Sequence, residues 1–155
     1  MNKLREVRDE KKLDNKGFSL VELIIVIAIM AVLIGVLAPQ YLKYVEKSRV
    51  SADADQIDTL ISAVEIYSAE NGVVTGNITI NTDGTVEATG TAGDGVAGNV
   101  TVIGALEDAG LDIGNVKVSS KTFKEGAVIN FNENGVTVTG TGKSKIATAL
   151  GRKEG

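Results

Sequence analysis

Hydrophobic and polar residues divide the chain into stretches of different periodicity, and the first stretch is almost wholly apolar. From Phe18 to Ala38, 21 residues are apolar or small at nearly every position, and Glu22 is the only charged residue among them. A helix of this length spans roughly 31 Å, which is close to the hydrocarbon thickness of a bilayer. A helix buried in a small soluble domain rarely stays apolar on all sides for so long, so the pattern predicts a membrane span.

The second stretch has the spacing of an amphipathic helix. Its apolar positions are Ile57, Leu60, Ile61, Val64 and Tyr67, and the opposite side carries Asp55, Asp58, Ser62 and Glu65. This spacing predicts a helix with one face packed on a soluble domain. Asn71-Gly72 is a plausible C-terminal stop. We therefore expect one helix from Phe18 to about Asn71, with a length of roughly 80 Å.

Two residues near the end of the apolar stretch predict a bend in this helix. Pro39 lacks a backbone donor and clashes with the preceding turn, and Gly35 adds local looseness. The helix is expected to kink here without ending. Tyr41 and Tyr44 follow the span and are typical of an aromatic belt at a membrane surface.

The third stretch, residues 72–155, holds 16 of the 18 glycines and several short alternating segments. Ile78–Ile80 and Val86–Ala88 flank Thr82-Asp83-Gly84, and a three-residue loop would place Ile80 opposite Val86. Further along, Ile129–Phe131 and Val136–Val138 flank Asn134-Gly135, and a two-residue turn there would align Phe131 with Val138.

The remaining segments of this stretch predict smaller elements. Val116–Val118 alternates like a strand, and Thr101–Ala109 is typical of a short helix or turn. Gly90–Gly98 has the composition of a surface loop, and residues 143–155 are expected to form a solvated, partly ordered end. The predicted fold is α+β, with a long bent N-terminal helix packed on a small antiparallel sheet. Its expected parts are residues 1–17, a span at 18–39, an amphipathic half at 40–71 and a β-rich domain at 72–155.

Composition removes several classes of function. The chain has no Cys, His or Trp, which excludes disulfides, cysteine chemistry, His-containing metal sites and nucleophile–His catalysis. The net charge of −4 argues against binding to a nucleic-acid backbone through bulk charge. Asp83 and Asp94 could contribute to a calcium site, but no ligand run of EF-hand type is present. We predict no catalytic residue, no cofactor and no metal.

Glu22 is the one residue in the apolar stretch that requires an explanation. A carboxylate deep in a bilayer costs about 2.5–3.5 kcal/mol, and the span contains no cation to pair with it. Cleavage between Gly17 and Phe18 would create an α-amine on Phe18. Between two chains offset along their axes, the amine of one chain could meet Glu22 of the next. One alternative is that the stretch is a secretory signal cleaved after Ala38. That cut would leave Pro39 just past the cleavage site, which is unfavourable for the protease. The simpler alternative is that Glu22 lies at interface depth.

The segment Lys16–Leu23, KGFSLVEL, resembles the processing motif of type IV pilins and their pseudopilin relatives. The resemblance implies that Gly17 is the last leader residue, cut by a prepilin peptidase, and that Phe18 becomes an N-methylated terminus. It also implies that Glu22 pairs with the Phe18 amine of a neighbouring subunit, and that Pro39 is a helix-bending proline. The motif covers Lys16 to about Pro39.

Two features depart from the simplest members of that family. The leader, residues 1–17, is long and carries four acidic residues against six basic ones, and its net charge of +2 still favours the cytoplasmic side. Many relatives close a C-terminal loop with a disulfide, which this cysteine-free chain must replace by other contacts. Cysteine-free pilins are common in Gram-positive bacteria, which favours such a source.

The resemblance predicts a structural subunit of a type IV pilus-like filament. Its expected partners are copies of itself, a prepilin peptidase, a pilus assembly platform, minor pilins and membrane lipid before assembly. The expected location is a single-pass position in the cytoplasmic membrane, followed by the cell surface. The alternatives are a pseudopilin of a type II secretion or competence DNA-uptake system and a single-span anchored surface protein that never polymerises.

Overall fold

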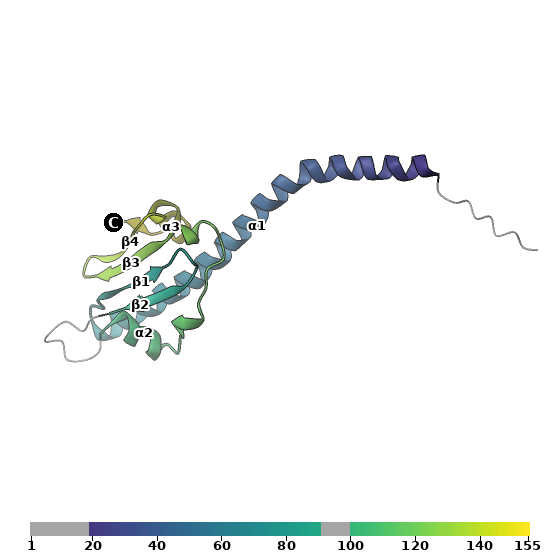
Figure 1. The fold of residues 1–155 in the computed structure, drawn as a ribbon. Coiled ribbons are helices and arrows are strands. Elements are labelled where there is room, and N and C mark those ends of the chain that lie inside the picture. Colours follow the sequence, from purple (N-terminus) through teal and green to yellow (C-terminus); the bar gives the residue numbers. More distant parts are fainter. Residues whose placement is uncertain (1–18, 91–99) are drawn as a thin grey trace, which may run out of the picture. The chain divides into compact units, whose positions relative to one another are not determined.

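The computed structural model describes residues 19–90 and 100–155. Its longest element is helix α1, Leu20–Asn71, which includes Pro39 without interruption (Figure 1). Contacts divide the chain into two units between Tyr41 and Leu42, so the two are described separately. The leader, Gly17, Phe18 and nearly all of the Gly90–Gly98 loop lie outside the described residues.

The first unit contains the apolar half of α1, and its large side chains have no cover. From Leu20 to Leu37 these side chains are between 50% and 72% exposed. Within the described residues, α1 is the one helix that is long and apolar enough to cross a membrane. An exposed apolar surface of this extent is typical of a segment that contacts lipid or other protein.

The second unit begins with the amphipathic part of α1. Its buried positions are Asp53, Ala54, Ile57, Leu60, Ile61 and Val64. Tyr67 is half-buried, and the helix ends at Asn71 before Gly72, whose φ of 100° suits glycine. The predicted helix face and C-terminal stop are both confirmed.

The sheet of this unit has five strands in the order β2-β1-β3-β4-β5. The strands are β1 (Gly76–Ile80), β2 (Val86–Thr89), β3 (Ala127–Asn132), β4 (Gly135–Thr139) and β5 (Lys153–Glu154). The first four pair antiparallel, whereas β5 pairs parallel with β4. The α+β fold class is confirmed, but the sheet is mixed and not wholly antiparallel. The parallel pair follows from the helix that connects β4 with β5.

The first hairpin has the predicted register. Ile80 pairs with Val86 and Ile78 with Ala88, which leaves Thr82-Asp83-Gly84 as a three-residue loop. Gly84 has a φ of 92°, and an added Cβ would lie 2.6 Å from the Val118 carbonyl oxygen. Glycine is therefore required at this position for both conformation and space.

The register predicted for the second hairpin is wrong. Phe131 pairs with Val136, and Ile129 pairs with Val138, so the turn residues are Glu133 and Asn134. The Asn132 side-chain oxygen accepts a hydrogen bond from the Asn134 N–H at 2.9 Å, which stabilises this earlier two-residue turn. The shift also places two fully buried side chains, Ile129 and Val138, opposite each other in the core.

The shorter elements are partly as expected. Helix α2, Val102–Asp108, confirms the short helix, and its N-cap Thr101 accepts a hydrogen bond from the Gly104 N–H. Val116–Val118 is not a strand, because only Lys117 forms a bridge, to Thr85. The segment lies between two 3-10 helices, η1 (Ile113–Asn115) and η2 (Phe123–Glu125).

The expectation of a partly ordered C-terminal end is also wrong. Residues 143–155 form helix α3, Lys143–Leu150, followed by β5. Ile146, Ala147 and Leu150 bury one face of α3, and Gly151 ends it in the left-handed conformation. Arg152 then contacts α1. Its guanidinium donates to both carboxylate oxygens of Glu65, with 3.1 Å between Nη2 and Oε2, and to Oδ1 of Asp58 at 3.3 Å. The Glu65 carboxylate raises the pKa of the Arg152 guanidinium.

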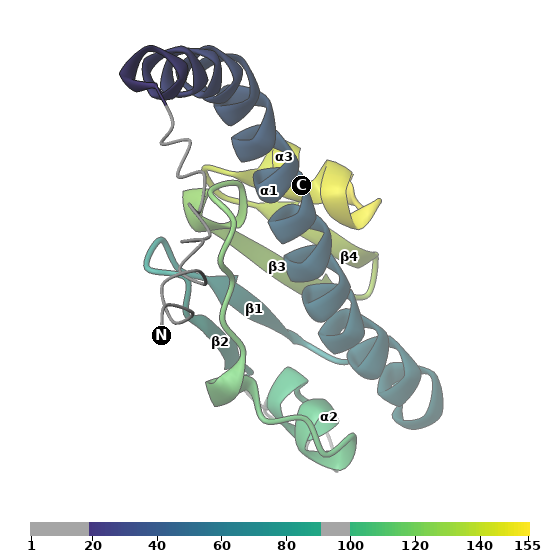
Figure 2. The same ribbon diagram turned by 90° about the vertical axis from the view of Figure 1, so that its right-hand side faces the viewer.

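One core holds the second unit together, between α1 and a single face of the sheet (Figure 2). Along β1 and β3, alternate residues are fully buried, as for Ile78 and Ile129, while Asn77 and Asn130 are only half-buried. Helix α2 packs beside β1 and β2, and α3 packs beside β3 and β4. The fold is thus two layers, with the sheet supplying a flat apolar surface for the helix.

A polar anchor attaches the chain after β2 and η1 to α1. The buried Asp53 carboxylate accepts hydrogen bonds from the backbone N–H groups of Ser119, at 3.0 Å, and Ser120, at 2.7 Å. About two turns earlier on α1, Glu46 accepts from the Lys121 N–H at 2.6 Å. These contacts hold the segment that leads into η2, whose Phe123 is fully buried. They do so without a covalent bond.

Removal of the Asp53 carboxylate should destabilise the domain. In Asp53→Ala, the Ser120 N–H is left buried without its acceptor, so we expect a loss of about 1–3 kcal/mol in the free energy of unfolding. Urea denaturation of the full-length protein in detergent would measure it. Asp55→Ala is the matched control, because Asp55 is exposed on the same helix. Equal stability of the two variants would contradict the anchoring role.

Candidate functional site

Glu22 lies in the first turn of α1 and caps the start of its own helix. Its Oε2 atom accepts a hydrogen bond from the Ser19 N–H at 2.8 Å. In return, the Ser19 hydroxyl oxygen accepts from the Val21 N–H at 3.3 Å. Ser at the N-cap with Glu three residues later forms a capping box, which satisfies backbone donors at a helix N-terminus.

This capping role was not anticipated from the sequence, although its signal was there. Ser19-Leu20-Val21-Glu22 has the Ser-x-x-Glu spacing immediately before a long apolar run. The partner predicted for Glu22 from the sequence was a cation. The structure adds a neutral partner within the same chain, so the carboxylate is not isolated even in a single subunit.

The capping box leaves part of the carboxylate available. Within residues 19–90 and 100–155, no hydrogen bond or salt bridge engages the Oε1 atom of Glu22. A carboxylate has several acceptor sites on two oxygens, so Glu22 can hold Ser19 and still receive a cationic donor. Exposed apolar side chains surround it, and in such surroundings the attraction between opposite charges is strong.

The structure describes only some of the other predicted site residues. Gly17 and Phe18, the predicted cleavage and methylation positions, lie outside the described residues. Gly35 and Pro39 both lie inside α1, and an added Cβ at Gly35 would meet no atom within 4 Å. The bend predicted at these two residues stays a prediction.

No metal centre emerges from the described part of the chain, where no group of three or more acidic ligands converges. The Asp83 carboxylate is occupied within its own turn, where it accepts from the Thr85 hydroxyl and N–H. The hydrogen bond from the Thr85 side chain lowers the pKa of Asp83. Asp94, the second residue considered for calcium, lies outside the described residues.

Comparison with known proteins gives two kinds of match. The family described as the prokaryotic N-terminal methylation motif matches residues 12–38. A type IV major fimbrial protein FimA of Dichelobacter nodosus is 35% identical over 91 residues, which is 50% of this chain and 58% of the relative. A second FimA of that organism is 33% identical over 100 residues, covering 59% of this chain and 64% of the relative. No solved structure matches.

The methylation motif and the two fimbrial relatives both point to the type IV pilin family. The resemblance predicted from KGFSLVEL is therefore confirmed, and the family consists of fimbrial subunits and not of enzymes. The matches cover about three fifths of the length of these two relatives, so they establish the family and leave the activity of the whole protein to be proposed. In this chain, the residues matched by the methylation motif include the capping box and the exposed apolar part of α1.

Two substitutions separate the capping role of Glu22 from its charge. In Glu22→Gln, a side-chain oxygen is still present to accept the Ser19 N–H, whereas Glu22→Ala removes the acceptor. Hydrogen exchange of the Ser19 amide in the detergent-solubilised protein should be faster in Glu22→Ala and nearly unchanged in Glu22→Gln. If Glu22→Ala leaves this amide as protected as in the parent protein, the capping box does not form.

Proposed function

We propose that this chain is the precursor of a structural subunit of a type IV pilus-like filament. The observation that carries the proposal is the uncovered apolar half of α1 with one carboxylate in its first turn. Transfer of the 14 large apolar side chains from Leu20 to Leu37 out of water would contribute roughly 20 kcal/mol or more of favourable free energy. Such a surface requires first a bilayer and then an equally apolar filament core.

In this proposal, the subunit waits in the cytoplasmic membrane as a single-pass protein and is then processed. A prepilin peptidase cuts between Gly17 and Phe18 and methylates the new Phe18 terminus. An assembly platform, with minor pilins, transfers the subunit into a filament on the cell surface. Movement from lipid to a core of packed helices conserves apolar burial, so hydrophobic burial contributes little to the choice of register between subunits.

In this proposal, Glu22 determines the register between neighbouring subunits. Its free Oε1 atom accepts the cationic Phe18 amine of a neighbouring subunit, while Oε2 remains on Ser19. A misplaced neighbour would leave a carboxylate without its cation in an apolar core, which is strongly unfavourable. Gly35 and Pro39 would give α1 the compliance to fit among its neighbours.

The names of the two relatives favour a pilus over a secretion or DNA-uptake system. Both are major fimbrial proteins, and neither is named as a secretion or DNA-uptake component. This supports a major filament subunit over a pseudopilin. It also disfavours an anchored surface protein that never polymerises.

Mass spectrometry of subunits sheared from the cell surface would test processing. We expect a chain that begins at Phe18 and carries one added methyl group on its amine. Recovery of chains that retain Met1, from cells with an active prepilin peptidase, would refute the proposed cleavage. Filaments built from unmethylated Phe18 would refute only the modification.

The charge of Glu22 should matter for assembly beyond its capping role. Removal of one partner of a buried ion pair costs about 3–5 kcal/mol, so Glu22→Gln and Glu22→Ala should both reduce sheared filaments more than tenfold. Ser19→Ala is the control, because it disturbs the capping box but keeps the carboxylate. Filament yield is measured against the membrane-bound subunit by immunoblot. Near-normal yield with Glu22→Gln would show that capping alone accounts for Glu22.

A further inference from the structure

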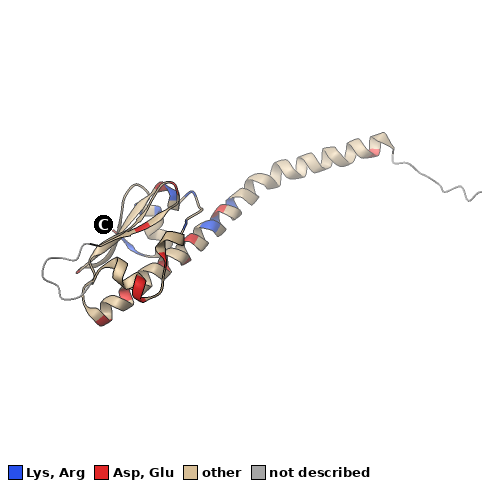
Figure 3. Cartoon of the chain, turned by 60° about the horizontal axis from the view of Figure 1, so that its bottom comes forward, with Lys and Arg blue, Asp and Glu red and all other residues tan. Residues whose placement is uncertain are grey.

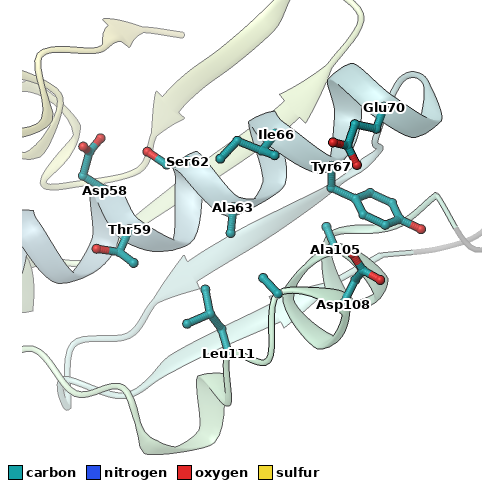
Figure 4. Close-up of a pocket in the computed structure, with 11 residues that line it drawn as sticks. Asp58, Thr59, Ser62, Ala63, Ile66, Tyr67, Glu70, Ala105, Asp108 and Leu111 are labelled. Carbon is teal, nitrogen blue, oxygen red and sulfur yellow. The ribbon is translucent and has the colours of Figure 1, made fainter.

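A groove of about 470 Å³ runs between α1 and the segment around α2 (Figure 4). Ala63 from α1, with Ala105 and Leu111 from the other wall, contributes apolar surface. Ile66 is 64% exposed beside it, which is unusual for an isoleucine in a folded domain. The groove therefore has the apolar lining of a docking surface.

The polar residues of the groove are acidic. Asp58, Glu70 and Asp108 line it, and an adjoining hollow of about 320 Å³ shares Leu111 and adds Glu107 and Asp112. No Lys or Arg lines either hollow. Asp58 contacts Arg152, but within the part of the chain that the structure describes the other four acids form no salt bridge. We call this surface the acidic groove.

A basic surface with an aromatic residue lies earlier on the same helix. Lys43, Tyr44 and Lys47 are three and four residues apart, which places them on one stripe. Tyr44 is 72% exposed, and no salt bridge among the described residues engages Lys43 or Lys47. Figure 3 shows basic residues on this part of α1 and only acidic ones farther along it. We call this surface the basic stripe.

The two surfaces cannot meet within one copy, because both belong to one helix. Their midpoints, near residues 45 and 64, are separated by 19 residues, or about 28 Å along a helix. We propose that the acidic groove receives the basic stripe of a second copy, displaced by about this distance along the filament axis. The inference rests on the proposed function as a filament subunit.

A second copy is favoured over another partner by charge and geometry. The groove offers carboxylates around an apolar floor, and the stripe offers two ammonium groups beside an exposed aromatic ring. Parallel copies shifted along their helices bring these unlike surfaces together, and each copy keeps a free groove or stripe for the next. Such a head-to-tail contact generates an open filament. Before assembly, the same stripe can lie at the membrane surface, as expected for Tyr44.

The absence of cysteine from the chain permits a direct test by cross-linking. Lys47→Cys and Asp108→Cys are introduced together, and sheared filaments are treated with a short bis-maleimide. We expect a ladder of covalent multimers in denaturing gels, because each copy links to the next. Each single variant should give no ladder. The pair Lys47→Cys with Glu133→Cys is the matched control, since Glu133 is exposed in the β3–β4 turn.

Charge reversal gives a second measurement if the cysteine variants assemble poorly. Lys47→Glu and Asp108→Lys should each reduce filament yield several-fold, and their combination should restore most of it. The membrane-bound pool should stay constant, because neither change touches the apolar span. Intact filaments without a ladder and without rescue would overturn the groove proposal and leave the proposed function standing. Cross-links only to a different protein would also overturn it. Failure of the parent chain to form any filament would overturn both.

Discussion

A single helix must satisfy two different apolar environments, and this constraint governs the rest of the molecule. Its second half buries Ile57, Ile61 and Val64 completely against the sheet. Its first half buries none of its large side chains in the described structure. The sheet domain packs on the second half of this same helix.

The polar residues of this helix lie at separate positions along it, and each position has a different structural or proposed role. Glu22 lies where the helix begins, Lys43 and Lys47 follow the span, Asp53 anchors the domain, and Glu70 lines the groove near the end. Hydrophobic burial has little directional preference, whereas a carboxylate or an ammonium group penalises each wrong position. We infer that the apolar surfaces provide the affinity between subunits, and the few charges decide where along the axis they stop.

Much of this could be read from the residues, and the failures have physical causes. Long periodic patterns were reliable, so the long helix, its buried face around Ile57–Val64 and its stop at Gly72 were predicted correctly. The register of the second hairpin failed because the Asn132 side chain stabilises a turn one residue earlier than Asn134-Gly135 indicates. Helix α3 was missed because four basic residues in 143–155 obscured the spacing of Ile146, Ala147 and Leu150. The groove joins segments at least 35 residues apart and the Asp53 anchor joins residues 67 apart, which no local pattern reveals.

The Asp53 anchor has a consequence for a domain exposed outside a cell. Two carboxylates of α1 hold the backbone amides of this segment without a covalent bond. Contacts of this kind are insensitive to oxidants and reductants in the surroundings. They also re-form spontaneously after mechanical rupture, so a stretched fibre could recover its original shape without any enzyme to reseal it.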